Sequence, residues 1–259
     1  LYTLFFTEMW ERMSYYGMRG ILVLFMTASI LDGGLEIDTV SASAIYGIYS
    51  ACVYLVALLG GWLADRHIGQ QSAILYGGFI IMLGHFLLAF TNLQAFYLGL
   101  IFVVLGTGLL KPNISAIVGG LYENDLEKKE SGFTIFYMSI NIGSILGFFI
   151  CGYVVEIIGW HYGFGAAGIG MAFGLIQFVL TKGNLGSIGL KPSVELNRES
   201  RKKELRIFNS FMFIFFLIIL FGLLGYLSFD PIPIANILTV IILLIAILYF
   251  IYLFTFGNL

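Results

Sequence analysis

The sequence has few charged residues and few residues that could bind a metal. Asp, Glu, Lys and Arg make up 11% of its 259 residues, against about 25% in a typical soluble domain. It has two cysteines, Cys52 and Cys151, and both lie inside apolar runs where packing is expected rather than a disulfide or a metal site. The sequence has no Walker A loop and no HExxH or GxSxG motif. We therefore expect no enzyme and no metal or organic cofactor, and the net charge of -2 gives no sign of a nucleic-acid partner.

Long apolar segments take the place of these features. Hydrophobic residues make up 59% of the chain. A helix that crosses a bilayer needs ~20 mostly apolar residues. Segments of this kind lie at 2–30, 40–64, 72–90, 94–120, 132–156, 162–181, 208–227 and 235–256. The sequence therefore predicts an all-α membrane protein with eight spans.

Between the apolar segments, Lys and Arg occur in only every second connecting stretch. They are Arg66, Lys128, Lys129, Lys182, Lys191, Arg198, Arg201, Lys202, Lys203 and Arg206. Loops that carry an excess of Lys and Arg stay on the cytoplasmic side, so we expect the start of the chain to be cytoplasmic. The run 198–206 also predicts a cytoplasmic linker with an unspecific attraction to anionic lipid.

The first apolar segment contains four charges. One helical face, about 140° wide, carries Glu8, Glu11, Arg12, Tyr15, Tyr16 and Arg19. A charge at bilayer depth costs ~2.5–3.5 kcal/mol on insertion scales, and such residues usually face a polar cavity. Protonating a carboxylate would release its arginine, which can couple proton movement to another step. A static ion-pair network is the alternative. Arg19 lies two helical turns beyond the carboxylates, so we expect it to have no acidic partner. A cation of this kind suggests an anionic ligand.

Further polar residues lie inside other apolar segments. Lys111 stands near the middle of 94–120, where it pairs with one of the carboxylates, binds substrate, or snorkels to the membrane surface. Tyr46, Ser50 and Tyr54 predict a polar stripe along 40–64. Asn141, in 132–156, binds either a ligand or a neighbouring helix.

Glycines at helical spacing predict close helix contacts. Gly143 and Gly147 form one small-xxx-small pair, and Gly170 and Gly174 form another. Gly60 begins the stretch "GGWLADRHIG", residues 60 to 69, which resembles the loop signature of the major facilitator superfamily.

Four stretches together resemble one family, the proton-dependent oligopeptide transporters of the major facilitator superfamily. The stretches are "EMWERMSYYGMR" at 8–19, "GGWLAD" at 60–65, "LLKPNIS" at 109–115 and "FYMSINIGS" at 136–144. The resemblance implies a major facilitator fold with an N-terminal six-helix bundle at 1–181 and a basic cytoplasmic linker at 182–207. It also implies an inserted pair of transmembrane helices at 208–256, and a C-terminal six-helix bundle that is absent from this chain.

The resemblance also implies a function and its residues. The family imports di- and tripeptides with protons by alternating access, with protons as the coupling ion. The implied proton-coupling residues are Glu8, Glu11, Arg12 and Lys111. The implied substrate-binding residues are Arg19, Tyr15, Tyr16, Tyr54, Lys111 and Asn141. The implied partners are the peptides, the lipid bilayer and the missing bundle, in a plasma membrane of bacterial inner-membrane type.

Two other functions fit the same residues. Arg19 and Lys111 could hold another organic or inorganic anion, or the protein could bind peptide as a receptor without transporting it. The sequence also departs from the family at Met13, where Phe is common, and at Ala57, where many members have Pro.

Overall fold

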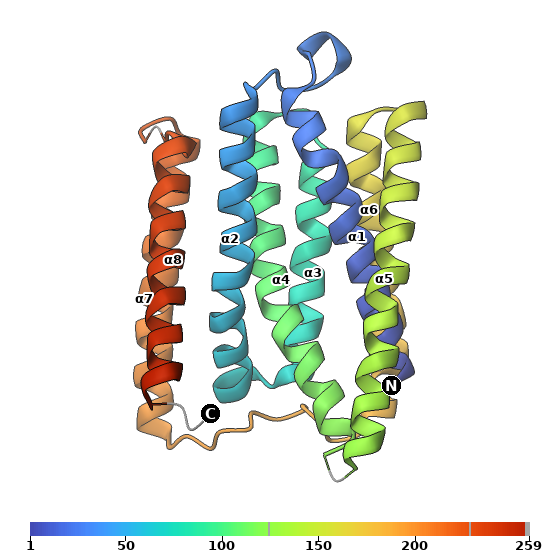
Figure 1. Ribbon diagram of the computed structural model, residues 1–259, viewed down its shortest axis with the longest axis vertical. Helices are drawn as coiled ribbons and strands as arrows, with labels where there is room; N and C mark the ends of the chain where they lie inside the picture. The colour runs from blue at the N-terminus through green and yellow to red at the C-terminus, as the bar shows by residue number, and fades with distance from the viewer. Residues whose placement is uncertain (124, 228, 257–259) are drawn as a thin grey trace.

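The computed structural model describes residues 1–123, 125–227 and 229–256, and its long elements are all helices (Figure 1). Each of the eight predicted segments forms an α-helix. The helices are α1 (Tyr2–Thr27), α2 (Thr39–Leu63), α3 (Gln70–Leu88), α4 (Leu93–Leu121), α5 (Leu126–Ile157), α6 (Trp160–Thr181), α7 (Arg198–Leu223) and α8 (Pro231–Phe256). Short helical turns occupy η1 (Ile30–Asp32), η2 (Ala64–Ile68) and η3 (Lys182–Leu185).

The charged helix α1 differs from the others in composition. Within the described residues, seven helical stretches are long and apolar enough to cross a membrane, and α1 is not among them. Its charges at Glu8, Glu11 and Arg12 are buried, with 2%, 0% and 2% of each residue exposed. Helix α1 packs against α5 and α6, so these charges face protein rather than lipid. This shielding explains how a helix with four charges can lie among membrane spans.

Two helices, α5 and α7, begin well before their apolar segments, at residues 126 and 198 rather than 132 and 208. Helix α5 begins at Leu126, where Asp125 Oδ1 accepts a hydrogen bond from Lys128 N at 3.1 Å. Hydrogen bonds from Lys128, first of all from its side chain, hold the pKa of Asp125 below its usual range. Helix α7 begins at Arg198, where Asn197 Oδ1 accepts from Ser200 N at 2.7 Å. The basic run of the predicted linker therefore forms the first turns of α7, while the domain boundaries themselves stay predictions.

Glycines bring α1 into close contact with α5 and α6. A Cβ atom at Gly143 or Gly147 of α5 would overlap the backbone carbonyl oxygens of Met9 or Met13. On α6, a Cβ at Gly174 would lie 2.9 Å from the Cβ of Trp10. The small-residue pairs predicted from the sequence therefore do lie at helix contacts, and they fix α1 between α5 and α6.

A second close contact fixes α4 against α2. A Cβ at Gly60 would overlap the carbonyl oxygen of Gly108. Pro112 lies inside the continuous helix α4 and has no N–H to donate to that carbonyl. The side chain of Asn113 donates to Gly60 O at 3.3 Å and so bridges the two helices. This contact sets the position of Lys111 relative to α2.

The last two helices stand apart from the core. Helices α7 and α8 lie beside α2, on the side away from α5 and α6 (Figure 1). None of the described residues of α7 is buried.

Side chains on the first turns of α7 bind the turn between α2 and α3. Arg66 donates two hydrogen bonds to Glu204, at 2.7 and 3.0 Å, and His67 Nε2 lies 3.2 Å from the same carboxylate. Arg201 Nη2 donates to His67 O at 3.0 Å. Phe208 packs against Trp62 with ring centroids 6.0 Å apart. These contacts fix the rotation of α7 about its own axis.

The segment before α7 follows the same turn. Val194 N donates to Asp65 O at 2.9 Å, and Gln71 Nε2 donates to Ile188 O at 2.7 Å. The backbone of Gly69 has φ +81°, and a Cβ there would lie 2.7 Å from Leu190 O. Only glycine fits this position without strain.

Exchanging one glycine for alanine tests the contact between α1 and α5. We expect Gly147→Ala to lower the midpoint of thermal unfolding, because its Cβ would overlap Met13 O and overpacking costs ~1–3 kcal/mol. Gly152→Ala on the same helix is the matched control, because nothing lies within 4 Å of its Cβ. Alanine favours helix, so this control should be unchanged or more stable. Equal midpoints for the two variants would contradict the close contact.

Candidate functional site

Arg12 lies between two carboxylates in the buried part of α1. Its Nε atom is 2.9 Å from Glu8 Oε1 and 2.5 Å from Glu11 Oε2. The side chain of Glu11 is 0% exposed, and those of Arg12 and Glu8 are 3% exposed. The predicted pairing of Glu8 with Arg12 is therefore present, and a second carboxylate joins it.

This cluster has more hydrogen-bonding capacity than it uses. Glu8 Oε2, Glu11 Oε1 and Arg12 Nη2 are buried and have no hydrogen-bond partner among the described residues. Two carboxylates also face one guanidinium. Lys111 of α4 lies near enough to act electrostatically on Glu8, although it forms no ion pair with it in the described structure. Buried polar atoms without partners are costly, so the cluster is suited to binding a proton or a polar ligand.

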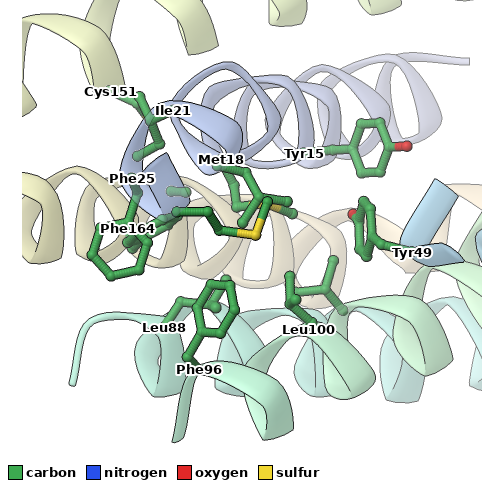
Figure 2. Close-up of a cluster of buried hydrophobic side chains, with 14 of the residues drawn as sticks. Tyr15, Met18, Ile21, Phe25, Tyr49, Leu88, Phe96, Leu100, Cys151 and Phe164 are labelled. Carbon is green, nitrogen blue, oxygen red and sulfur yellow. The ribbon is translucent and has the colours of Figure 1, made fainter. Parts of the chain in front are cut away.

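Two tyrosines of α1 lie beside the guanidinium of Arg12. Its carbon atom lies 5.0 Å from the ring centroid of Tyr15 and 5.9 Å from that of Tyr16, close enough for cation–π attraction. The Tyr15 ring stacks on Tyr49 with centroids 6.4 Å apart. Figure 2 shows this pair at one end of a buried cluster, with Met18, Phe25 and Phe164 further along. Tyr15 therefore links the charged cluster to this apolar cluster.

Tyr49 is absent from the sequence-predicted site. It is 4% exposed, and its hydroxyl has no hydrogen-bond partner among the described residues. The residue also interacts electrostatically with Glu11, Arg12 and Arg19. The stripe predicted on α2 consists of Tyr46, Ser50 and Tyr54, and it leaves out Tyr49, the residue before Ser50. The sequence signal for Tyr49 was its place three residues, about one helical turn, after Tyr46.

Arg19 has an aromatic partner and no acidic one. Its Nε atom donates a hydrogen bond to Tyr46 Oη, and its guanidinium carbon lies 5.1 Å from the centroid of the Tyr46 ring. No acidic side chain in the described part of the chain forms an ion pair with Arg19. Within these residues the positive charge of Arg19 is not paired with a carboxylate, so it is available to an anion.

Lys111 is a second cation without an ion pair. Its Nζ atom lies 4.8 Å from the ring centroid of Tyr54 on α2. Lys111 is half-buried, and no acidic side chain among the described residues lies within ion-pair distance. Of the roles predicted for Lys111, direct pairing with Glu8 or Glu11 is not present in this structure. Cation–π attraction to Tyr54 holds the amine instead.

Asn141 lies on the helix that covers Arg12. Its side-chain amide is exposed and makes no hydrogen bond within the described residues. Two residues further along α5, a Cβ at Gly143 would lie 2.8 Å from the Cβ of Arg12. The predicted site residues therefore come from α1, α2, α4 and α5, with Tyr54 61% exposed and Asn141 also exposed.

Comparison with known proteins gives the family of this chain. The model of the POT family (PTR2) matches residues 71–212, more than half of the chain. The chain belongs to the POT family. This is a family of transporters, in agreement with the expectation that the protein is not an enzyme.

Relatives extend the POT match over almost the whole chain. A peptide transporter of Yersinia enterocolitica is 41% identical over 99% of this chain and 52% of its own length. A di-/tripeptide transporter of Lactococcus lactis is 38% identical over 98% of this chain and 52% of its own. A crystal structure of peptide transporter POT in complex with sulfate matches with a TM-score of 0.87 and 39% identity, covering 99% of this chain and 52% of that one. The chain spans about half the length of these relatives, and corresponds to their N-terminal portion.

The POT match confirms the family and the all-helical membrane fold predicted from the sequence motifs. The chain is an integral membrane protein with multiple spans. The roles of single residues and the orientation in the membrane stay predictions.

Two variants, each of which removes one positive charge, test the buried cluster. We expect Arg12→Gln to cost ~3–5 kcal/mol of stability, because it leaves Glu8 and Glu11 buried without a cation. Arg19→Gln removes the same charge where no acidic partner is present, so its effect should be much smaller. Thermal unfolding of the purified protein at neutral pH measures both. Equal losses for the two variants would contradict the central place of Arg12.

Proposed function

We propose that this chain forms the N-terminal half of a proton-coupled symporter that imports di- and tripeptides by alternating access. The observation that supports this most strongly is the contrast between two kinds of charge at the site. Glu8, Glu11 and Arg12 form a buried cluster with an excess carboxylate, whereas Arg19 and Lys111 form no ion pair with any residue that the structure describes. Relatives that carry the names peptide transporter and di-/tripeptide transporter support the same substrate class.

The peptide's C-terminal carboxylate binds to Arg19 and Lys111 in this proposal. Both cations are held by tyrosine rings, which position a charge without neutralising it. Tyr15, Tyr16, Tyr54 and Asn141 line the pocket and supply hydroxyl, amide and aromatic contacts to the peptide. Charge-assisted hydrogen bonds of this kind are stronger than neutral ones, so the carboxylate supplies much of the affinity.

Proton coupling acts through the ion-pair cluster. In the outward-open state, Glu8 or Glu11 takes up a proton from the external side and loses its attraction to Arg12. The released positive charge, together with Lys111, favours binding of the peptide carboxylate. The two halves of the transporter then rock to the inward-open state. Release of the proton and the peptide to the cytoplasm restores the ion pairs.

The rest of the polypeptide completes the site in this proposal. A C-terminal six-helix bundle faces α1, α2, α4 and α5 and supplies the residues that bind the amino end of the peptide. The start of this chain lies on the cytoplasmic side of a plasma membrane of bacterial inner-membrane type, because the basic loops at Arg66, Lys128 and 182–207 all fall on one side.

A carrier of another anion is the second candidate function. The half-buried cations Arg19 and Lys111 suit a small anion, and one related crystal structure is described as a complex with sulfate. Peptide and inorganic anion differ in size and in the amino group, so competition between them distinguishes the two functions. A non-transporting receptor would bind peptide without accumulating it.

A carboxylate exchange tests the coupling role. We expect full-length protein with Glu11→Gln to lose accumulation of labelled dialanine driven by an inward proton gradient in proteoliposomes. Exchange of labelled for unlabelled dialanine at equal pH should continue, because this process needs no net proton movement. The matched control is Glu156→Gln, an exposed carboxylate on the same bundle, which should keep both activities. Gradient-driven accumulation by Glu11→Gln equal to that of the control would contradict the coupling role.

A substrate without its carboxylate tests the cationic pocket. We expect Lys111→Gln to weaken dialanine binding by roughly tenfold or more, since a hydrogen bond to a charged group contributes ~1.5–3 kcal/mol. Dialanine amide should bind weakly to the original protein and lose little more in the variant. Competition against labelled dialanine measures all four affinities. If Lys111→Gln weakens the binding of dialanine and of its amide equally, the peptide carboxylate does not bind to Lys111.

A further inference from the structure

Helix α7 has two unlike polar faces at its cytoplasmic end. Arg201, Glu204 and Phe208 face the turn between α2 and α3, as described above. A second face carries Lys202, Arg206, Asn209 and Ser210. At 100° per residue, the centres of these two faces lie about 150° apart around the helix. The contacts of the first face therefore direct the second face away from the α2–α3 turn.

The second face forms a groove with a polar end and an apolar end. The groove is shallow and open, with a volume of about 790 Å³, and all of its lining residues belong to α7. Lys202, Arg206, Asn209 and Ser210 line its polar end. Phe213 and Ile214, 61% and 57% exposed, line the rest together with the partly buried Leu205. A ligand for this groove needs hydrogen-bond acceptors with negative charge at one end and hydrocarbon at the other.

The two cations in the groove lack acidic partners. No acidic side chain within the described residues forms an ion pair with Lys202 or Arg206. By contrast, the carboxylate of Glu204 on the other face is bound by Arg66 and His67. The positive charge of the groove is therefore not neutralised by any carboxylate in the described part of the chain.

The groove also lies at the depth of a membrane surface. Polar residues end at Ser210, and the stretch from Phe211 to Leu223 is apolar apart from glycine. Helix α7 is among the stretches long and apolar enough to cross a membrane. Basic side chains at such a boundary lie at the level of the phospholipid headgroups.

We propose that this groove is a binding site for one anionic phospholipid of the cytoplasmic leaflet. Lys202 and Arg206 donate to the headgroup phosphate. Asn209 and Ser210 donate to the ester or glycerol oxygens beneath it, and an acyl chain lies along Phe213 and Ile214. A phospholipid has the required order of groups, because its charged head and its hydrocarbon follow one another along the membrane normal. The inference is independent of the proposed transport of peptides, since it rests on α7 and its contacts with the turn between α2 and α3.

Retention of added lipid by the full-length protein tests the site. The purified protein in detergent is incubated with phosphatidylglycerol or phosphatidylcholine, and native mass spectrometry counts the bound lipids. We expect one phosphatidylglycerol to bind in preference to phosphatidylcholine. Lys202→Gln with Arg206→Gln should weaken this binding roughly thirtyfold, since each basic residue near an anionic surface contributes about fivefold. Soluble glycerol phosphate at millimolar concentration should not displace the lipid, because it lacks the acyl chains.

Two further variants separate a built site from general charge attraction. Lys182→Gln with Lys191→Gln removes the same charge from the same linker, outside the groove, and should keep lipid binding. Asn209→Ala with Ser210→Ala keeps the net charge and should weaken binding severalfold. Circular dichroism and thermal unfolding check that each variant folds. Equal binding by the groove variants and the linker control, or displacement by glycerol phosphate alone, would overturn the proposal.

Discussion

The pairing of one arginine with two carboxylates determines how the rest of this structure is built. Arg12, Glu8 and Glu11 are buried in the bundle, where an unpaired charge would be strongly unfavourable. The pairing leaves one negative charge in excess. That excess can be met by a proton, by the nearby Lys111 or by a change in the pairing, and each choice alters the charge presented to a ligand.

The glycine contacts serve this cluster. Helix α5 can cover Arg12 only because Gly143 and Gly147 let its backbone approach α1 closely, and Gly60 does the same for α2 and α4. Larger residues would separate these helices and admit lipid or water to the carboxylates. The pairing of the charges therefore depends on the close spacing of the helices, and a change in either affects the other.

The sequence predicted the helices and the charged face well, because both follow from periodicity and apolar length. Which side of α2 is buried was harder to predict. Periodicity favoured Tyr46, Ser50 and Tyr54, yet Tyr49 is the buried residue against Tyr15, because the rotation of α2 is set by its contact with α4. Contacts of the linker with the α2–α3 turn were also missed. Several of them use backbone groups, such as Val194 N with Asp65 O, and these leave no pattern in the side chains.

The most direct test of the account is whether peptide movement carries protons. Full-length protein is placed in liposomes that contain a pH-sensitive dye, with equal pH on both sides, and dialanine is added outside. The account predicts that the lumen acidifies as labelled dialanine enters, and that an uncoupler abolishes the acidification. Entry of dialanine with no change in lumenal pH would show that the carboxylate–arginine cluster does not couple protons to transport.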